Sequence, residues 1–199
     1  SVVIASYTAS NKVTQLLTTP YGAMGVTMAT YAAQNRGIND ISRIRKGTAA
    51  AMIMSAIFSL TIFAISVPAL PVLLKLFVDT RSGNVDFAAV LSYAKTYVYA
   101  AGTCYIALGT IFILRNTMQG CGFSISAMTG GIVELVCRAI ISFAAAAKMS
   151  YFGVCLGDPL TWAITAVFFV VMYYHTVAHM NKKKKEYMKR EHNVDLHRM

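Results

Sequence analysis

Apolar residues are gathered into long blocks along this chain, and polar residues are concentrated between them. Five mostly apolar stretches cover residues 5–33, 47–74, 88–114, 124–149 and 160–180. Each is long enough to cross the hydrocarbon core of a bilayer, which needs about 20 residues per helix. The gaps are short and resemble neither a soluble domain nor a flexible linker. The pattern therefore predicts an all-α transmembrane bundle over residues 1–181, followed by a basic tail over residues 182–199, either a frayed helix or a disordered segment.

Composition and charge agree with a membrane protein. Hydrophobic residues make up 56% of the 199 residues and charged residues 13%, whereas soluble domains carry about 25% charged residues. The net charge is +10, but seven of the eighteen Lys and Arg residues lie in the last eighteen positions. No aromatic or glycine pattern of a nucleic-acid binder accompanies them, so nucleic acid is not an expected partner. The four cysteines lack metal or redox spacing and are interpreted as small hydrophobic residues in a reduced or lipid-buried setting.

The distribution of Lys and Arg predicts an orientation. Alternate gaps must lie on the same side of the membrane, and one side then holds twelve Lys and Arg residues against four on the other. Positive residues favour the cytoplasmic side, so the tail and the 34–46 gap are predicted to be cytoplasmic, in a plasma-membrane protein. The first helix then begins outside. Five spans with a cytoplasmic end predict at least one further span before Ser1, in a longer protein.

A polar stripe runs along the first predicted helix. Positions 8, 11, 12, 15, 18, 19 and 22 share one helical face. Lipid cannot hydrogen-bond such side chains, so the stripe must face protein or water. It supplies candidates for a substrate pathway, namely Asn11, Lys12, Gln15, Thr18 and Thr19. In the alternative interpretation Asn11 and Gln15 join neighbouring helices, and Lys12 extends to the membrane interface.

The same helix contains a predicted hinge. Pro20, Gly22 and Gly25 lie near its middle, where Pro removes a backbone hydrogen bond and Gly adds conformational freedom. Alternatively, the two glycines only permit close packing of a neighbouring helix.

Aromatic side chains gather in the third predicted helix. Tyr97 and Tyr105 lie deeper than a belt of interfacial tyrosines would. They are candidates for the wall of a site that binds flat cations. The alternative is that they belong to the interfacial tyrosines, as Tyr93 does.

The fourth predicted helix carries two ionisable residues. Glu134 and Arg138 are four residues apart and therefore share a face, with Glu134 about 15 Å from the helix start. Charges at that depth must pair or face a wet cavity. Three interpretations remain open: a static ion pair, a proton- or ion-coupled switch, or direct contact with substrate. His175 and His179 have metal-ligand spacing without a third ligand, so they are interpreted as interface residues and no metal site is predicted.

Several segments resemble one family of transporters. They occur in order along nearly the whole chain: Pro20-Tyr21-Gly22-Ala23-Met24-Gly25-Val26-Thr27, Ala33-Gln34-Asn35-Arg36-Gly37 with the basic Arg43-Ile44-Arg45-Lys46-Gly47, Arg115-Asn116-Thr117-Met118-Gln119-Gly120-Cys121-Gly122, Gly131-Ile132-Val133-Glu134-Leu135-Val136-Cys137-Arg138, and Pro159-Leu160-Thr161-Trp162. Together they resemble the multidrug and toxic compound extrusion (MATE) family.

The resemblance implies a five-helix fragment of a twelve-helix, two-lobe MATE-type transporter. The five helices would be the eighth to the twelfth, and the missing N-terminal lobe of the same chain would be the main partner, together with the lipid bilayer. It further implies antiport of small-molecule organic cations or drugs against protons or sodium, with no other cofactor. The family's coupling acids in this half lie in the seventh and tenth helices. The stretch matching the tenth has no Asp or Glu between Lys95 and Arg115, which leaves Glu134 as the membrane-embedded acid here.

Two other function classes are considered. One is a lipid-linked oligosaccharide flippase of the same superfamily, which would need a more cationic cavity than Lys12 and Arg138 provide. The other is a non-transporting membrane interaction protein. The sequence contains no metal triad, nucleophile elbow or phosphate-binding loop, so an enzyme is not predicted.

Overall fold

Helices make up nearly all of the described structure. The computed structural model describes residues 2–77, 86–147 and 151–196, with the side chains of 146 and 191–196 left out. The elements are α1 (Val2–Gly37), α2 (Ile41–Leu74), α3 (Phe87–Gly102), α4 (Tyr105–Gly120), α5 (Ser124–Ala147), α6 (Tyr151–Cys155) and α7 (Gly157–Leu196). No strand is present among these residues, and the predicted all-α class is confirmed.

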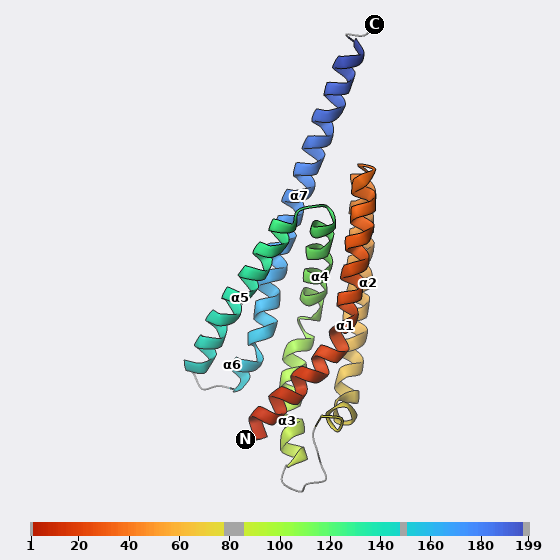
Figure 1. Cartoon of the computed structure of the whole chain (residues 1–199). Helices are drawn as coiled ribbons and strands as arrows, with labels where there is room; N and C mark the ends of the chain where they lie inside the picture. The colour runs from red at the N-terminus through yellow and green to blue at the C-terminus, as the bar shows by residue number, and fades with distance from the viewer. Residues whose placement is uncertain (1, 78–85, 148–150, 197–199) are drawn as a thin grey trace.

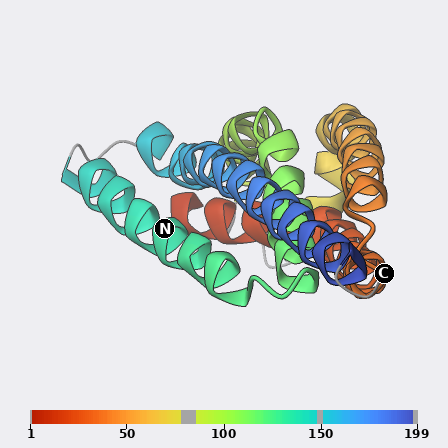
Figure 2. The same cartoon turned by 90° about the horizontal axis from the view of Figure 1, so that it is seen from above.

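The bundle is organised around α4. This helix contacts α1, α2, α5 and α7, and α5 runs beside α7 on the opposite side of the molecule from α2 (Figure 2). Exposed apolar side chains cover much of α2 and α5, for example Ile53, Leu60, Leu135 and Phe143. In water such a surface would be costly, but against lipid tails it has no penalty. These two helices therefore present apolar surfaces of the kind that pack against lipid or another membrane helix.

The large buried side chains of the core come from several helices. Tyr21 of α1, Tyr97 and Tyr105 of α3 and α4, and Phe169 of α7 are almost fully buried in one cluster. Tyr21 OH lies 2.6 Å from Ser59 Oγ of α2, which satisfies both hydroxyls inside the bundle. The interior thus combines aromatic packing with hydrogen bonds between neighbouring helices.

The third predicted span is not one straight helix. The stretch 88–114 is divided into α3 and α4, which meet at an angle of 48° across residues 103–104. Thr103 Oγ1 donates to Ala100 O at 2.8 Å, a local bond that competes with the helical backbone pattern. Gly102 lies directly against the Phe63 ring, where a side chain would collide. The length of the apolar stretch alone could not predict this break.

The other predicted boundaries also shift. The 34–46 gap shrinks to residues 38–40, because Asp40 caps α2 by accepting a hydrogen bond from Arg43 N at 3.0 Å. The fourth helix is described to Ala147, and positions 148–149 lie outside the described residues. The tail predicted as frayed or disordered continues α7 to Leu196 (Figure 1). No Gly or Pro interrupts the stretch 160–196, and Lys and Glu are good helix formers.

The described residues contain three helices that are long and apolar enough to cross a membrane, or up to four if the bent pair counts as one span. They are Ile41–Leu74, Ser124–Ala145 and Tyr151–Arg190, with Phe87–Gly102 and Tyr105–Gly120 as the bent pair. α1 has sufficient length but is more polar, as its stripe requires. The chain is a multi-pass membrane protein.

The predicted hinge of α1 lies within an unbroken helix. α1 continues through Pro20 to Gly37, and Figure 1 shows that it changes direction part-way along its length. Gly25 is buried against Asn116 of α4, and an added Cβ would lie 2.6 Å from Asn116 Nδ2. Gly22 has open space around its Cα. Gly25 therefore permits close helix packing, while hinge motion at Pro20 and Gly22 stays a prediction.

Candidate functional site

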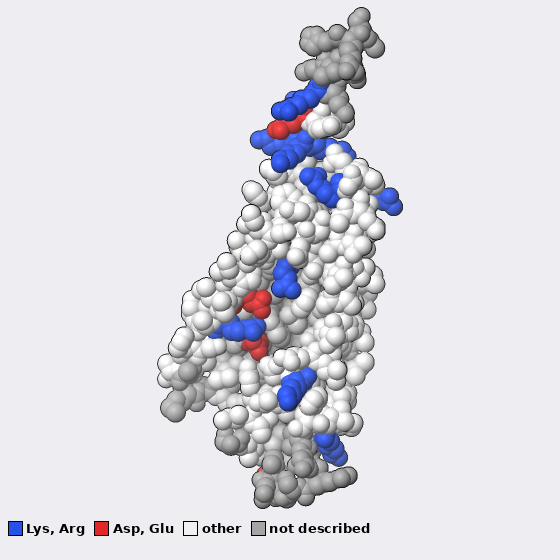
Figure 3. Space-filling view, in the orientation of Figure 1, with Lys and Arg blue, Asp and Glu red and all other residues white. Residues whose placement is uncertain are grey.

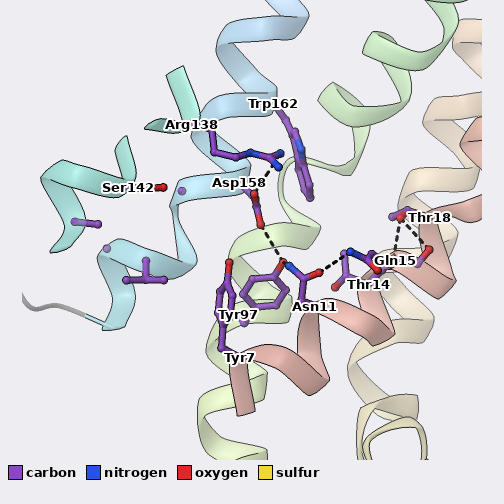
Figure 4. Close-up of a pocket in the computed structure, with 14 residues that line it drawn as sticks. Tyr7, Asn11, Thr14, Gln15, Thr18, Tyr97, Arg138, Ser142, Asp158 and Trp162 are labelled. Atoms are coloured by element: carbon purple, nitrogen blue, oxygen red, sulfur yellow. Dashed lines mark hydrogen bonds and ion pairs between the residues drawn. The ribbon is translucent and has the colours of Figure 1, made fainter. Parts of the chain in front are cut away.

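A polar cavity opens between α1, α3, α5 and the start of α7. Its volume is about 300 Å³, and charged side chains are visible part-way along an otherwise mostly uncharged face of the bundle (Figure 3). Polar and aromatic side chains from four helices converge on it (Figure 4). The main lining residues are Tyr7, Asn11, Thr14, Gln15, Thr18, Tyr97, Arg138, Ser142, Asp158 and Trp162.

A chain of polar contacts crosses this cavity from α5 to α1. Arg138 Nη2 lies 3.4 Å from Asp158 Oδ1, and Tyr97 OH donates to Asp158 Oδ2 at 3.2 Å. Asn11 Nδ2 donates to Tyr97 OH at 3.2 Å, and Gln15 Nε2 donates to Asn11 Oδ1 at 2.9 Å. Movement of α5, α7, α3 or α1 would therefore alter at least one of these contacts.

Two carboxylates share one guanidinium group beside this cavity, which Arg138 and Asp158 line and Glu134 does not. Arg138 Nη2 also lies 3.2 Å from Glu134 Oε1. With all three groups ionised, the formal charge of the cluster is −1. The side chains are 47% exposed for Arg138, 26% for Glu134 and 15% for Asp158. The exposure means that the ion pairs contribute little to stability, whereas the uncompensated charge favours a bound cation.

Local structure explains where each of the three charges lies. Glu134 and Arg138 are one turn apart on α5, as the sequence predicts. Asp158 lies in the first turn of α7, where the positive end of the helix dipole stabilises a carboxylate. The predicted fifth stretch begins at Leu160 and so left Asp158 in the preceding gap, whereas the structure places Asp158 in α7, where it is a second acid beside Arg138 in addition to Glu134. An acidic residue directly before Pro159 is a helix-start pattern that could have indicated it.

The structure brings together only part of the predicted pathway. Asn11, Gln15, Thr18 and Tyr97 line the cavity. Lys12 and Thr19 are exposed outside its lining. Tyr105 is fully buried in the core. Asn11 fits both interpretations of the α1 stripe. It donates a hydrogen bond to Tyr97 of α3 and it also lines the cavity.

His179 and the four cysteines show no sign of metal binding in the described residues. His179 packs edge-on against Phe123, with ring centroids 6.0 Å apart. Cys104, Cys121, Cys137 and Cys155 are all free thiols. Within residues 2–77, 86–147 and 151–196, no group of three His, Cys, Asp or Glu side chains is placed to hold a metal ion.

Comparison with known proteins identifies the family. The family model described as MatE matches residues 1–144, which is most of the chain. The chain belongs to the MATE family. Of the segments on which the sequence resemblance rested, residues 20–27, 33–37, 43–47, 115–122 and 131–138 fall inside this match, and residues 159–162 lie outside it.

Solved MATE structures share the fold. The crystal structure of a MATE protein in complex with MaL6 is 15% identical, with a TM-score of 0.79 over 90% of this chain. An inward-facing multidrug resistance MATE family transporter of the MOP superfamily is also 15% identical, with a TM-score of 0.78 over 91% of this chain. The chain spans 40% and 43% of the lengths of these two proteins. A search of curated proteins finds no significant match.

Cysteine labelling tests whether the polar stripe lines a water-filled path. With Cys104 and Cys137 first replaced by alanine, Asn11→Cys and Gln15→Cys in the full-length MATE protein are expected to react with a membrane-impermeant thiol reagent. The reason is that both positions face the cavity. Val13→Cys is the control, since Val13 is fully buried on another face of α1. Protection at both stripe positions would show that the stripe is packed against protein.

Proposed function

We propose that the full-length MATE protein is a secondary active antiporter that exports organic cations or drugs in exchange for protons or sodium, by alternating access between two lobes. The observation that supports this proposal best is the excess of one carboxylate over guanidinium in the cluster of Glu134, Arg138 and Asp158 at the cavity wall. A cluster of this charge attracts cations, whether a substrate or a coupling ion. The aromatic side chains Tyr7, Tyr97 and Trp162 line the same cavity, and aromatic rings attract cations.

Asp158 is the side chain best placed to couple cation movement to helix movement. It contacts Arg138 of α5 and Tyr97 of α3 while its own helix is α7, and Tyr7 of α1 lies close enough to interact electrostatically. A proton or sodium ion bound at this carboxylate would replace part of its interaction with Arg138. Release of Arg138 would then loosen α5 from α7, a difference in contacts between two states of the kind that coupling requires.

The flippase alternative needs positive charge in the cavity to hold a pyrophosphate group. Arg138 is the one Lys or Arg among the residues that line the cavity, and two carboxylates already contact it. Lys12 does not line the cavity. The charge balance therefore favours a cationic substrate.

The direct test is dye transport by the full-length protein in proteoliposomes with an imposed sodium or proton gradient. A fluorescent organic cation is expected to move against its own gradient with one of the two ions, and the effective ion is the coupling ion. The control is the same liposomes with the gradient collapsed by an ionophore. If the folded protein moves no cation with either gradient, antiport is excluded and lipid-linked sugars become the next substrates to test.

A further inference from the structure

A basic hollow lies where α7 leaves the bundle and passes the turn between α1 and α2. It has a volume of about 370 Å³ and is lined by Arg36, Asn39, Lys183, Lys184 and Tyr187. No carboxylate is among these lining residues. The hollow is separate from the polar cavity, with which it shares no residue.

One of the three cations fixes the shape of the hollow. Lys184 Nζ donates to Asn39 O at 3.0 Å, which joins the extension of α7 to the α1–α2 turn. Asn39 has a positive φ of 56°, so the turn presents its carbonyl in an unusual direction. Arg36 is oriented by Asn39 Oδ1, at 3.5 Å from its Nη1. Lys183, the residue before Lys184 on α7, completes the rim.

The surroundings of the hollow are strongly positive. Ten Lys and Arg residues occur in residues 36–46 and 182–190, against Asp40 and Glu186 as the acids. Figure 3 shows Lys and Arg gathered at this end of the molecule. The side chain of Asp40 is already engaged with the backbone of α2. An anion in the hollow would therefore meet little local repulsion.

The position of the hollow matches the headgroup level of a bilayer. Directly beneath it, Ala32, Ile41, Ile44, Val177 and Met180 form an apolar cluster between α1, α2 and α7. The change from this cluster to the cations takes about one helical turn of α7. Ile38 at the turn is 66% exposed and Tyr187 is 64% exposed. Exposed apolar and aromatic groups beside cations are typical of a surface that contacts both headgroups and acyl chains.

We propose that this hollow binds the phosphate of an anionic phospholipid headgroup, and that the bound lipid joins α7 to the α1–α2 turn. Arg36 and Lys183 would donate to the phosphate oxygens, Lys184 would maintain the turn, and Ile38 would contact the acyl chains. The predicted cytoplasmic location of this end agrees with the anionic lipids of that leaflet. The inference is independent of the proposed transport activity, because it concerns another surface and another ligand.

The test compares two double variants of equal charge in the full-length protein. Arg36→Gln/Lys183→Gln removes two cations from the hollow, whereas Lys185→Gln/Lys189→Gln removes two exposed cations of the same helix that do not line it. Native mass spectrometry would count retained phosphatidylserine, phosphatidylglycerol and phosphatidylcholine after mild delipidation. The hollow variant is expected to retain the anionic lipids at least tenfold less than wild type, and the control variant to stay within about twofold of wild type, because only the hollow variant loses direct donors to the phosphate.

Three results would overturn the proposal. Equal loss in both variants would show diffuse attraction to the basic end, without a defined site. Retention of phosphatidylcholine at the level of the anionic lipids would show that headgroup charge is not recognised. A parallel measurement with inorganic phosphate distinguishes a lipid headgroup from a free anion. If the hollow binds phosphate at millimolar concentration but retains no anionic lipid, its ligand is a free anion. Thermal melting of both variants confirms that each remains folded.

Discussion

Asp158→Asn is expected to reduce gradient-driven transport of a fluorescent cation by at least tenfold, the factor that corresponds to about 1.4 kcal/mol. The amide oxygen can still accept from Tyr97 OH, now 3.2 Å from Asp158 Oδ2. However, the substitution removes the charge that interacts with Arg138 and with any bound cation. The measurement is initial uptake in proteoliposomes with the full-length protein and each ion gradient.

Glu134→Gln is the matched control for this prediction. Glu134 contacts Arg138 but is absent from the cavity lining, so its loss should slow transport less than the loss of Asp158 charge. Glu134→Ala should also leave stability nearly unchanged, because Arg138 keeps Asp158 as a partner. If Glu134→Gln abolishes transport and Asp158→Asn does not, Glu134 is the coupling residue and our assignment is wrong.

Gly120→Ala is expected to destabilise the folded protein by about 1–3 kcal/mol, the usual cost of forcing extra atoms into a packed interface. Gly120 ends α4 where it meets α1, and an added Cβ would overlap the carbonyl oxygen of Ala29 and lie 2.8 Å from its carbonyl carbon. Backbone atoms cannot rotate away as a flexible side chain can, so the α1–α4 contact must open. Thermal melting in detergent would measure the loss as a lower Tm.

Gly131→Ala provides the comparison in another helix. No atom lies within 4 Å of a Cβ at Gly131, and alanine is the better helix former by about 1 kcal/mol. Its Tm should equal or exceed that of the wild type. A fall of the same size in both variants would mean that backbone flexibility, and not the approach of α1, determines the cost at Gly120.

The broken α3–α4 pair connects the fold to the proposed mechanism. Tyr97 on α3 belongs to the polar chain across the cavity, and Tyr105 begins α4 in the core directly beyond the break. Interrupted helices near a binding site are common in secondary transporters, because the two halves can be positioned separately. Cation binding at Asp158 could therefore move α3 through Tyr97 while α4 retains its central contacts.

Local periodicity in the sequence was sufficient to predict several features of the structure. Apolar length predicted most of the helices, and the spacing of Glu134 and Arg138 predicted their contact, since neighbours at i and i+4 meet on any helix. The α1 stripe placed Asn11 and Gln15 at a polar surface for the same reason. The family motifs added the MATE assignment, which the match over residues 1–144 confirms.

The tertiary structure alone decided which polar groups meet. Asp158 contacts Arg138 and Tyr97 only because α7, α5 and α3 are rotated to face one cavity, and that rotation depends on the packing of all their side chains. The same packing turned Tyr105 into the core and left Lys12 outside the cavity. It also joined Lys184 to Asn39, 145 positions apart in the chain. A one-dimensional pattern fixes the faces of each helix, whereas the partner of each face follows from the three-dimensional fit between helices.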